Sequence, residues 1–437
     1  MNNAIFLKIV GRIIETPIGV LFIDHLLIDS DLKNKLIYFR KINRISNELK
    51  TEMPDSFPVT CRTNISGTCN IRCNFCEIHY FYSHAKNHSG NIYPNYLTVK
   101  NLGSMNDLLI GLSTFAFATG VGEPLINPYF CDLINFFHKN HPHISLSMTT
   151  NAVKLNDEIS NCILKSDNFD SISCSIHGGN EETYSELQGN QFTKVISNVE
   201  KFVQLRNKKR KKVPKVFINF CLNKKNAESL IPLLYIAKRI GIDGFFLYHY
   251  YQSRNKLVND ISFFSDSSDG NKFIMNAYKT AEKLHLTIYP EKPMLIEETS
   301  CDSFQNEDSP CYAPWHNIQF PPCLEYENKH LVGVCNRINL LRINFEKWGK
   351  SYQFIDIWHH PTLQYLRITV NTSEKNPVCR FCKSADTSQI RCLDPEEYSR
   401  RRDKAIRDFF KEMNAYFTDL PQIEGIELLD SNPYEYV

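Results

Sequence analysis

The chain has no long apolar run and no excess of charge of either sign. Its longest apolar stretch, residues 5–28, is broken by charged residues and a proline, so it falls short of the roughly 18 apolar residues of a transmembrane helix. The sequence also lacks a compact apolar region followed by a small-residue cleavage site, so we expect no secretory signal peptide. Lys and Arg number 50 and Asp and Glu 48, a net charge of +2 that argues against nucleic-acid binding. We therefore expect a cytoplasmic protein with no transmembrane segment.

Cysteine is too sparse for a disulfide scaffold. Fifteen cysteines in 437 residues are about 3%, below the ~8–10% typical of small secreted scaffolds. The composition, 42% hydrophobic and 22% charged, is that of a soluble globular protein and excludes disorder, collagen and coiled coil as the main architecture. In a reducing compartment, clustered cysteines are metal ligands or catalytic groups more often than disulfides.

Changes in residue pattern divide the chain into five segments. Residues 1–57 indicate an N-terminal helical extension that packs on the main domain, with attachment to a membrane surface as the alternative. Residues 58–290 alternate strand-like and helix-like patterns. Residues 291–310 form a polar linker, residues 311–395 a small cysteine-rich domain, and residues 396–437 a charged helix and an acidic tail.

The alternating segment predicts an α/β fold with parallel strands and right-handed crossovers. The expected strands are 59–65, 115–119, 144–149, 171–176, 216–221 and 244–248, and the expected helices are 98–112, 129–139, 157–165, 192–206 and 227–240. Six such units are too few for a closed eight-stranded barrel. The sequence therefore predicts a partial (β/α)6 barrel followed by a small C-terminal domain.

A first cysteine cluster follows the first expected strand. Cys69, Cys73 and Cys76 have the spacing C-x3-C-x2-C, at the end of the strand where α/β barrels place their active sites. A closed zinc or iron–sulfur site uses four protein ligands, so three cysteines would leave one iron of a [4Fe–4S] cluster open to another ligand. The alternative is a Cys3His zinc site completed by His79, His84 or His88.

This motif resembles the signature of the radical S-adenosylmethionine (SAM) superfamily. That family has an aromatic residue before the third cysteine, near the adenine of SAM, and Phe75 matches it. A family motif of the Gly-Gly-Glu-Pro type corresponds to Gly120-Val-Gly122-Glu123-Pro124, whose backbone carbonyls and Glu123 can take the ammonium of SAM. The resemblance extends through residues 58–290 and implies further SAM contacts from Asn151, Ser173 and Ser175, each of which alone is more often a polar residue at a strand end.

Some positions depart from the family pattern or remain ambiguous. Gln188 stands where relatives commonly have arginine, so no salt bridge to the SAM carboxylate is expected there. Asn219 and Asn226 fit the fifth unit. His177 and His249 follow the fourth and sixth strands and are either packed histidines or an acid or base.

A second set of cysteines resembles the SPASM/twitch extension of radical SAM enzymes. Cys311 precedes Pro-Trp, Cys335 follows glycine, and Cys379 and Cys382 form a C-x2-C pair. The resemblance implies that these four hold one auxiliary [4Fe–4S] cluster, in a twitch rather than a complete SPASM domain. Two others, Cys323 and Cys392, are ordinary thiols or ligands of a second, atypical cluster. A zinc site is the alternative for the whole set.

The remaining cysteines are scattered among strand and helix patterns. Cys61, Cys131, Cys162, Cys174, Cys221 and Cys301 are expected to be small buried hydrophobic residues. Cys174 and Cys221 lie near strand ends, so either is a minor candidate for a hydrogen donor. A basic run at residues 208–212 is interpreted as a solvated helix end.

Together these resemblances imply reductive cleavage of SAM to a 5′-deoxyadenosyl radical that abstracts hydrogen from a substrate. The expected cofactors are two [4Fe–4S] clusters and SAM, with flavodoxin or ferredoxin as electron donor. The leading hypothesis is an oxidoreductase acting on a small molecule, with the auxiliary cluster as electron acceptor. The alternatives are a peptide or protein maturase and a non-catalytic iron–sulfur electron carrier.

Overall fold

In the computed structural model, the segments that are described cover most of the predicted barrel and parts of the C-terminal third. They are residues 58–76, 95–117, 122–249, 260–263, 266–290, 293, 317–318, 329–333, 339–344, 354–370, 375–386, 395–417 and 426–429. The predicted N-terminal extension and all but one residue of the predicted linker lie outside this range.

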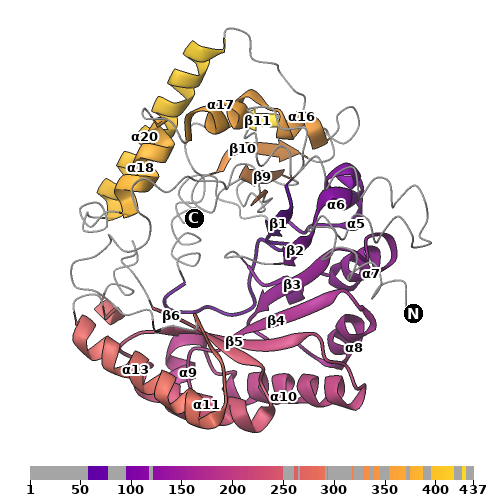
Figure 1. The fold of residues 1–437 in the computed structure, drawn as a ribbon, viewed down its shortest axis with the longest axis vertical. Helices are drawn as coiled ribbons and strands as arrows, with labels where there is room; N and C mark the ends of the chain where they lie inside the picture. The colour runs from indigo at the N-terminus through magenta and orange to yellow at the C-terminus, as the bar shows by residue number, and fades with distance from the viewer. Residues whose placement is uncertain are drawn as a thin grey trace, which may run out of the picture.

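A parallel sheet forms the centre of the molecule (Figure 1). Its six main strands follow chain order: β1 (Thr60–Thr63), β2 (Thr114–Phe117), β3 (Ser145–Thr150), β4 (Phe169–Ser175), β5 (Lys215–Leu222) and β6 (Gly244–His249). Two short strands extend it in parallel, β7 (Ile288–Tyr289) beside β6 and β8 (Asn317–Ile318) beside β1. The predicted parallel partial barrel is confirmed.

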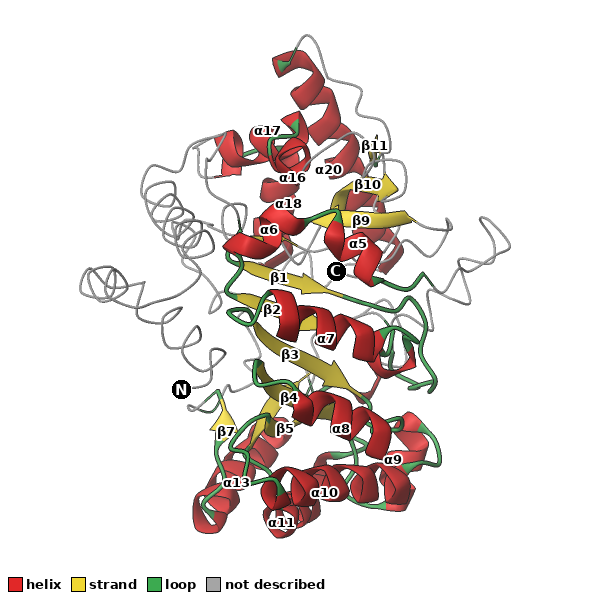
Figure 2. Ribbon diagram, turned by 90° about the vertical axis from the view of Figure 1, so that its right-hand side faces the viewer, coloured by secondary structure: helices red, strands yellow, loops and turns green. Residues whose placement is uncertain are grey.

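Helices cover the outer face of this sheet (Figure 2). The predicted helices correspond to α7 (Phe130–Asn140), α8 (Asp157–Lys165), α10 (Phe192–Lys208) and η2 (Ala227–Ser229) with α11 (Leu230–Ile240). The single helix predicted over residues 98–112 is wrong, because the chain forms α5 (Val99–Gly103) and α6 (Asn106–Gly111) with a break at Ser104 and Met105. Two more helices, α9 (Glu181–Gln188) and α13 (Ser267–Leu284), were not predicted.

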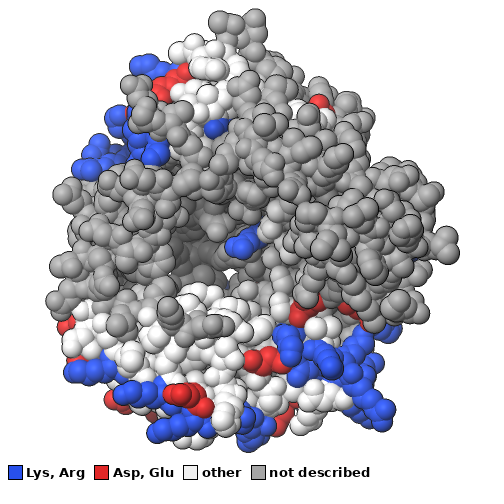
Figure 3. All heavy atoms as spheres, in the orientation of Figure 1, with Lys and Arg blue, Asp and Glu red and all other residues white. Residues whose placement is uncertain are grey.

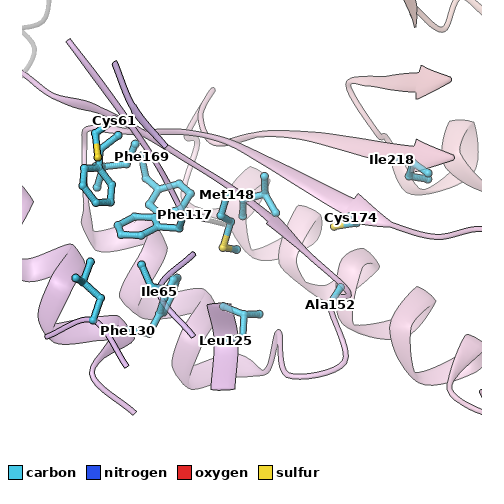
Figure 4. Packing of buried hydrophobic residues seen from close by; sticks show 14 of the residues in the cluster. Cys61, Ile65, Phe117, Leu125, Phe130, Met148, Ala152, Phe169, Cys174 and Ile218 are labelled. Atoms are coloured by element: carbon cyan, nitrogen blue, oxygen red, sulfur yellow. The ribbon is translucent and has the colours of Figure 1, made fainter. Parts of the chain in front are cut away.

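The main core lies between the sheet and these helices (Figure 4). Every second residue of a strand points to this layer, so Phe117, Met148, Cys174 and Ile218 are almost fully buried there. The intervening residues face the other, concave side of the sheet. They are small or polar along β3 and β4, and they are only partly buried. The concave side is therefore the part of the barrel that remains accessible.

The C-terminal third has a different architecture. It contains an antiparallel sheet of β9 (Lys329–Gly333), β10 (Asn339–Asn344) and β11 (Ile426–Leu428), together with α16 (Phe354–Trp358), α17 (Pro361–Val370), α18 (Pro377–Asp386) and α20 (Pro395–Tyr416). The guanidinium of Arg367 lies 4.1 Å from the centre of the buried Trp358 ring and donates to the Trp358 carbonyl at 2.8 Å. The loss of strand–helix alternation and the charged helix near residues 396–413 are confirmed.

The expectation for Cys131 and Cys162 is corrected by the structure. They are partly exposed and joined as a disulfide between α7 and α8. These helices follow successive parallel strands, so they lie side by side on the outer face, a proximity that residue spacing does not reveal. Of the other scattered cysteines that the structure describes, Cys61 and Cys174 are fully buried as predicted, while Cys221 is half-buried. Among the described helices, none is long and apolar enough to cross a membrane.

Candidate functional site

The first cysteine cluster lies in the loop that leaves the carboxyl end of β1. Cys69, Cys73 and Cys76 are each half-buried. The loop is anchored to α9 by a 3.0 Å hydrogen bond from the Asn74 backbone N–H to the Leu187 carbonyl. The buried amide of Asn127 holds the start of the loop by donating to the Ile65 and Leu97 carbonyls at 2.6 and 2.9 Å. Residue patterns do not predict either anchor, because each joins residues that are far apart in the chain.

The three thiols form one electrostatic group. Burial raises the pKa of Cys69 to about 11, and the neighbouring Glu123 and Cys76 add to this rise. Burial also raises the pKa of Cys73, and its two companion cysteines add to the rise. Thiols in this state stay protonated unless a cation lies beside them, and iron supplies such a charge. The three thiols therefore fit an iron–sulfur cluster held by three thiolates. A site for a single metal ion is a different arrangement, and among the described residues no group of three or more His, Cys, Asp and Glu side chains forms one.

Glycine is required at Gly122, where the loop after β2 passes over the cysteine loop. Its φ is +73°, and an added Cβ would lie 2.1 Å from the Ser66 carbonyl oxygen and 2.8 Å from that of Thr68. The next residue donates its backbone N–H to the Thr68 carbonyl at 2.8 Å. The two loops are therefore in direct backbone contact. Gly120 lies outside the described residues.

Glu123 is buried beneath the site rather than exposed in it. The residue is 2% exposed, and its carboxylate accepts hydrogen bonds from Thr150 Oγ1 at 2.5 Å, the Asn151 N–H at 2.7 Å and the Leu125 N–H at 3.1 Å. Burial raises its pKa to about 7, against the effect of these donors. The carboxylate thus links the loop after β2 to the end of β3, and its contacts are to protein.

Asn151 connects the end of β3 to the cysteine loop. Its Nδ2 lies 3.6 Å from Cys69 Sγ and 2.9 Å from Asn70 Oδ1, and its Oδ1 accepts the Val153 N–H. The interaction with Asn151 lowers the pKa of Cys69, which opposes the larger effect of burial. Among the predicted SAM contacts, Asn151 is thus directly beside a cluster cysteine.

The remaining predicted contacts lie on or near β4. Ser173 and Ser175 alternate with the buried Ile172 and Cys174, so both face the concave side. Phe75 is 7% exposed and packs edge-on against His177, with ring centres 5.2 Å apart. The structure therefore brings Phe75, Asn151 and the two serines to the same end of the barrel as the cysteines.

Gln188, in the position commonly occupied by arginine, has a structural role. It is 1% exposed, accepts the His177 N–H at 2.7 Å and donates to the Ser175 carbonyl at 3.0 Å. Asn226 is equally buried and donates to the carbonyls of His177 and Cys221. Both residues therefore tie the end of β4 to its neighbours.

The two histidines are part of the barrel wall. His177 Nδ1 accepts the Cys221 N–H at 3.1 Å, and burial lowers the pKa of His177 and of His249 to about 4. Both rings are thus neutral at pH 7.

Of the second cysteine set, the structure describes one side chain, Cys379. It lies in the first turn of α18, where Asn376 Oδ1 accepts its backbone N–H at 2.9 Å and Asn376 Nδ2 lies 3.2 Å from its sulfur. Cys382 follows one turn later on the same helix. The structure does not describe the side chain of Cys382, nor any part of Cys311, Cys323, Cys335 and Cys392. It also does not describe the three histidines of the alternative Cys3His zinc site, His79, His84 and His88.

Comparisons with known proteins agree with this geometry. Residues 63–231 match the radical SAM superfamily. The chain is similar to the tungsten-containing aldehyde ferredoxin oxidoreductase cofactor-modifying protein of Pyrococcus furiosus, with 22% identity over 344 residues that cover 76% of this chain and 91% of that protein. It is 24% identical to the mycofactocin maturase MftC of Mycobacterium ulcerans over 132 residues, which are 30% of this chain and 32% of MftC.

The fold is shared with a solved structure. SuiB of Streptococcus suis superposes with a TM-score of 0.51 at 17% identity, over 78% of this chain and 74% of SuiB. The family match spans the strands and loops that hold the three cysteines, Glu123, Asn151 and the β4 serines. Residues 63–231 therefore form a radical SAM domain, and enzymes of that superfamily use a [4Fe–4S] cluster and SAM.

Proposed function

We propose that this enzyme cleaves SAM reductively and uses the resulting radical to abstract hydrogen from a substrate bound on the concave side of the barrel. The observation that carries this proposal is that the loop with Cys69, Cys73 and Cys76 leaves the carboxyl end of β1, where Cys69 lies beside Asn151 at the end of β3. When bound, the cluster supplies the electron that cleaves SAM to methionine and a 5′-deoxyadenosyl radical. The barrel residues bind and orient the substrate and exclude water.

The surrounding residues have distinct proposed roles. Phe75 lines the adenine position, and Ser173 and Ser175 offer hydroxyls to the ribose or carboxylate of SAM. Asn151 orients Cys69. The Glu123 carboxylate accepts three protein hydrogen bonds, so we assign it mainly the role of positioning the loops. We assign binding of the SAM ammonium group to the backbone carbonyls of residues 120–122.

We also propose an auxiliary [4Fe–4S] cluster held by Cys311, Cys335, Cys379 and Cys382, within a twitch-like domain over residues 311–395. Residues separated by three positions on a helix lie on the same face, and this spacing of Cys379 and Cys382 on α18 supports the proposal that both bind one cluster. Asn376 supports this assignment, since its amide lies 3.2 Å from the Cys379 sulfur. The cluster would accept an electron from the substrate radical in a net oxidation.

Among substrate classes, we favour a peptide over a small molecule. The support is the similarity to MftC, which is named as a maturase. The Pyrococcus furiosus relative, named as a cofactor-modifying protein, keeps oxidation of a small molecule as the second candidate. A ferredoxin or flavodoxin is the proposed electron donor.

The test is anaerobic turnover of the reconstituted protein with SAM and dithionite. We expect 5′-deoxyadenosine by liquid chromatography, and no such product from a variant with Cys69, Cys73 and Cys76 replaced by Ala. Reducible clusters with no 5′-deoxyadenosine would instead indicate an electron carrier. Short peptides encoded beside the gene are then added. A peptide that loses hydrogen mass in a SAM-dependent manner supports the maturase, whereas conversion of small alcohols or sugars alone would contradict it.

A further inference from the structure

The strands β1 to β6, which form the concave side of the barrel, carry very little charge. Strands β1 to β6 contain three formally charged side chains, Arg62, Asp170 and Lys215. Asp170 and Lys215 lie at the amino-terminal ends of their strands, where Asp170 accepts a hydrogen bond from Ser145 and Lys215 pairs with Asp243 at 3.0 Å. Arg62 is thus the one charged side chain within β1 to β6 that does not lie at the amino-terminal end of its strand.

Arg62 faces the concave side and is open to a ligand. Its neighbours in β1, Cys61 and Thr63, are buried in the opposite direction, whereas Arg62 is exposed. Within the described part of the chain no carboxylate pairs with it, unlike Arg206, Arg239 and Arg342. Its register neighbours on β2 and β3 are Ala116 and Ser147, which are small and leave space beside the guanidinium. Figure 3 shows atoms of Lys or Arg side chains at the edge of the hollow near the centre of the molecular surface in that view.

Tyr248, on the strand at the other end of these six, faces the same concave side as Arg62. It lies on β6 between the buried Leu247 and His249 and is 45% exposed, so its phenol is also accessible. Burial raises the pKa of Tyr248, the adjacent Cys221 thiol adds to this rise, and the charge of Arg62 opposes it. Although β1 and β6 are separated by four strands of the sheet, Arg62 and Tyr248 both face its concave side. The curved sheet therefore presents a cation and a hydroxyl donor on the same side.

We propose that Arg62, together with the Tyr248 hydroxyl, binds a carboxylate of the substrate on the concave side of the barrel. This inference rests on the proposed function, since it names the chemistry of the molecule that enters there. A guanidinium presents two parallel N–H groups that match a carboxylate, and a phenol can donate a third hydrogen bond. A single cation suits a monoanion better than a phosphate, and the one other basic side chain of β1 to β6, Lys215, lies at the opposite, amino-terminal end of its strand.

The test is the protection of Arg62 from phenylglyoxal, a reagent that modifies accessible arginines, followed by peptide mass spectrometry of the reconstituted protein. The probes are N-acetylglycine, its uncharged analogue N-acetylglycinamide, and inorganic phosphate. We expect N-acetylglycine to slow modification of Arg62 saturably, by about fivefold or more at high concentration, and the amide to have no effect. Modification of Arg239, on the outer surface, is the internal control and should not change.

The Tyr248→Phe variant tests the second donor, and N-acetylglycine should protect its Arg62 at least a few-fold more weakly. Equal protection by the amide, stronger protection by phosphate, or an Arg62 that does not react at all would overturn the proposal. Undiminished protection in Tyr248→Phe would overturn the role of the phenol. These outcomes do not depend on SAM cleavage. A wild-type protein that forms no 5′-deoxyadenosine contradicts the proposed function instead.

Discussion

Asn151 Nδ2 lies 3.6 Å from the sulfur of Cys69, although the two residues are separated by 82 positions in the chain. The backbone N–H of the same asparagine donates to the buried carboxylate of Glu123. One residue at the end of β3 thus contacts both the cysteine loop and the loop after β2. Cys69, Asn151 and Glu123 are therefore connected through one asparagine, which couples the cysteine loop to the buried carboxylate.

Iron content tests the proposed clusters. The wild-type protein should bind about eight iron atoms per chain, and replacement of Cys69, Cys73 and Cys76 by Ala should leave about four, because each ligand set holds its own cluster. The same variant should form no 5′-deoxyadenosine. Replacement of Cys131 and Cys162 by Ala is the control and should leave the iron content unchanged. Stoichiometric zinc with little iron would show that the assignment is wrong.

The contact between the two loops is tested at Gly122. Replacement by Ala should lower the free energy of unfolding by about 2 kcal/mol or more, since the Cβ meets two carbonyl oxygens and φ is positive. SAM binding, measured by equilibrium dialysis, should weaken at least about tenfold. Gly103→Ala is the matched control: nothing lies within 4 Å of its Cβ, and Ala favours a helix by about 0.5–1 kcal/mol. Equal effects of the two changes would refute the role of Gly122.

The raised pKa of Glu123 predicts how stability depends on pH. Folding shifts this pKa from 4.5 to about 7, so the folded protein binds a proton more tightly than the unfolded chain. The stability contribution of this residue is therefore highest below pH 4.5, falls as the pH rises to about 7 and is constant above that.

Glu123→Gln isolates this effect. Its free energy of unfolding, relative to that of the wild type, should rise between pH 4.5 and 7 by up to a few kcal/mol. In addition to this pH-dependent change, the new side-chain amide faces the Asn151 N–H. This should lower the free energy of unfolding of the variant by about 1–3 kcal/mol at all pH values. Urea titrations of both proteins in the same state of reconstitution measure the difference. A difference that does not vary with pH would mean that Glu123 titrates normally.

Asn376 provides a test of the auxiliary cluster. Asn376→Ala removes both the acceptor for the Cys379 N–H and the donor to its sulfur, and should destabilise α18 by about 1 kcal/mol. Asn376→Asp keeps the acceptor but loses the donor and adds negative charge. We expect both variants to retain the cluster of Cys69, Cys73 and Cys76, and Asn376→Asp to lower the reduction potential of the auxiliary cluster in an electron paramagnetic resonance titration. An unchanged potential would exclude Cys379 as a ligand.

Local sequence determined the strands and the first cysteine set. Strands β3 to β6 were predicted to within a few residues because each contains a short apolar or β-branched run. The spacing of Cys69, Cys73 and Cys76 restricts the three thiols to one loop whatever surrounds them. The break between α5 and α6 escaped prediction because the apolar pattern continues across it.

Contacts between distant segments were decided only by the tertiary structure. The disulfide of Cys131 and Cys162, the burial of Glu123 under Thr150 and Asn151, and the common orientation of Arg62 and Tyr248 toward the concave side all involve residues from different βα units. Residue type and spacing describe one strand or helix at a time, whereas these pairings depend on which strands are neighbours and how strongly the sheet curves. The sequence by itself therefore determined which residues have the chemistry of a radical SAM site, and the curved parallel sheet decided which of them meet.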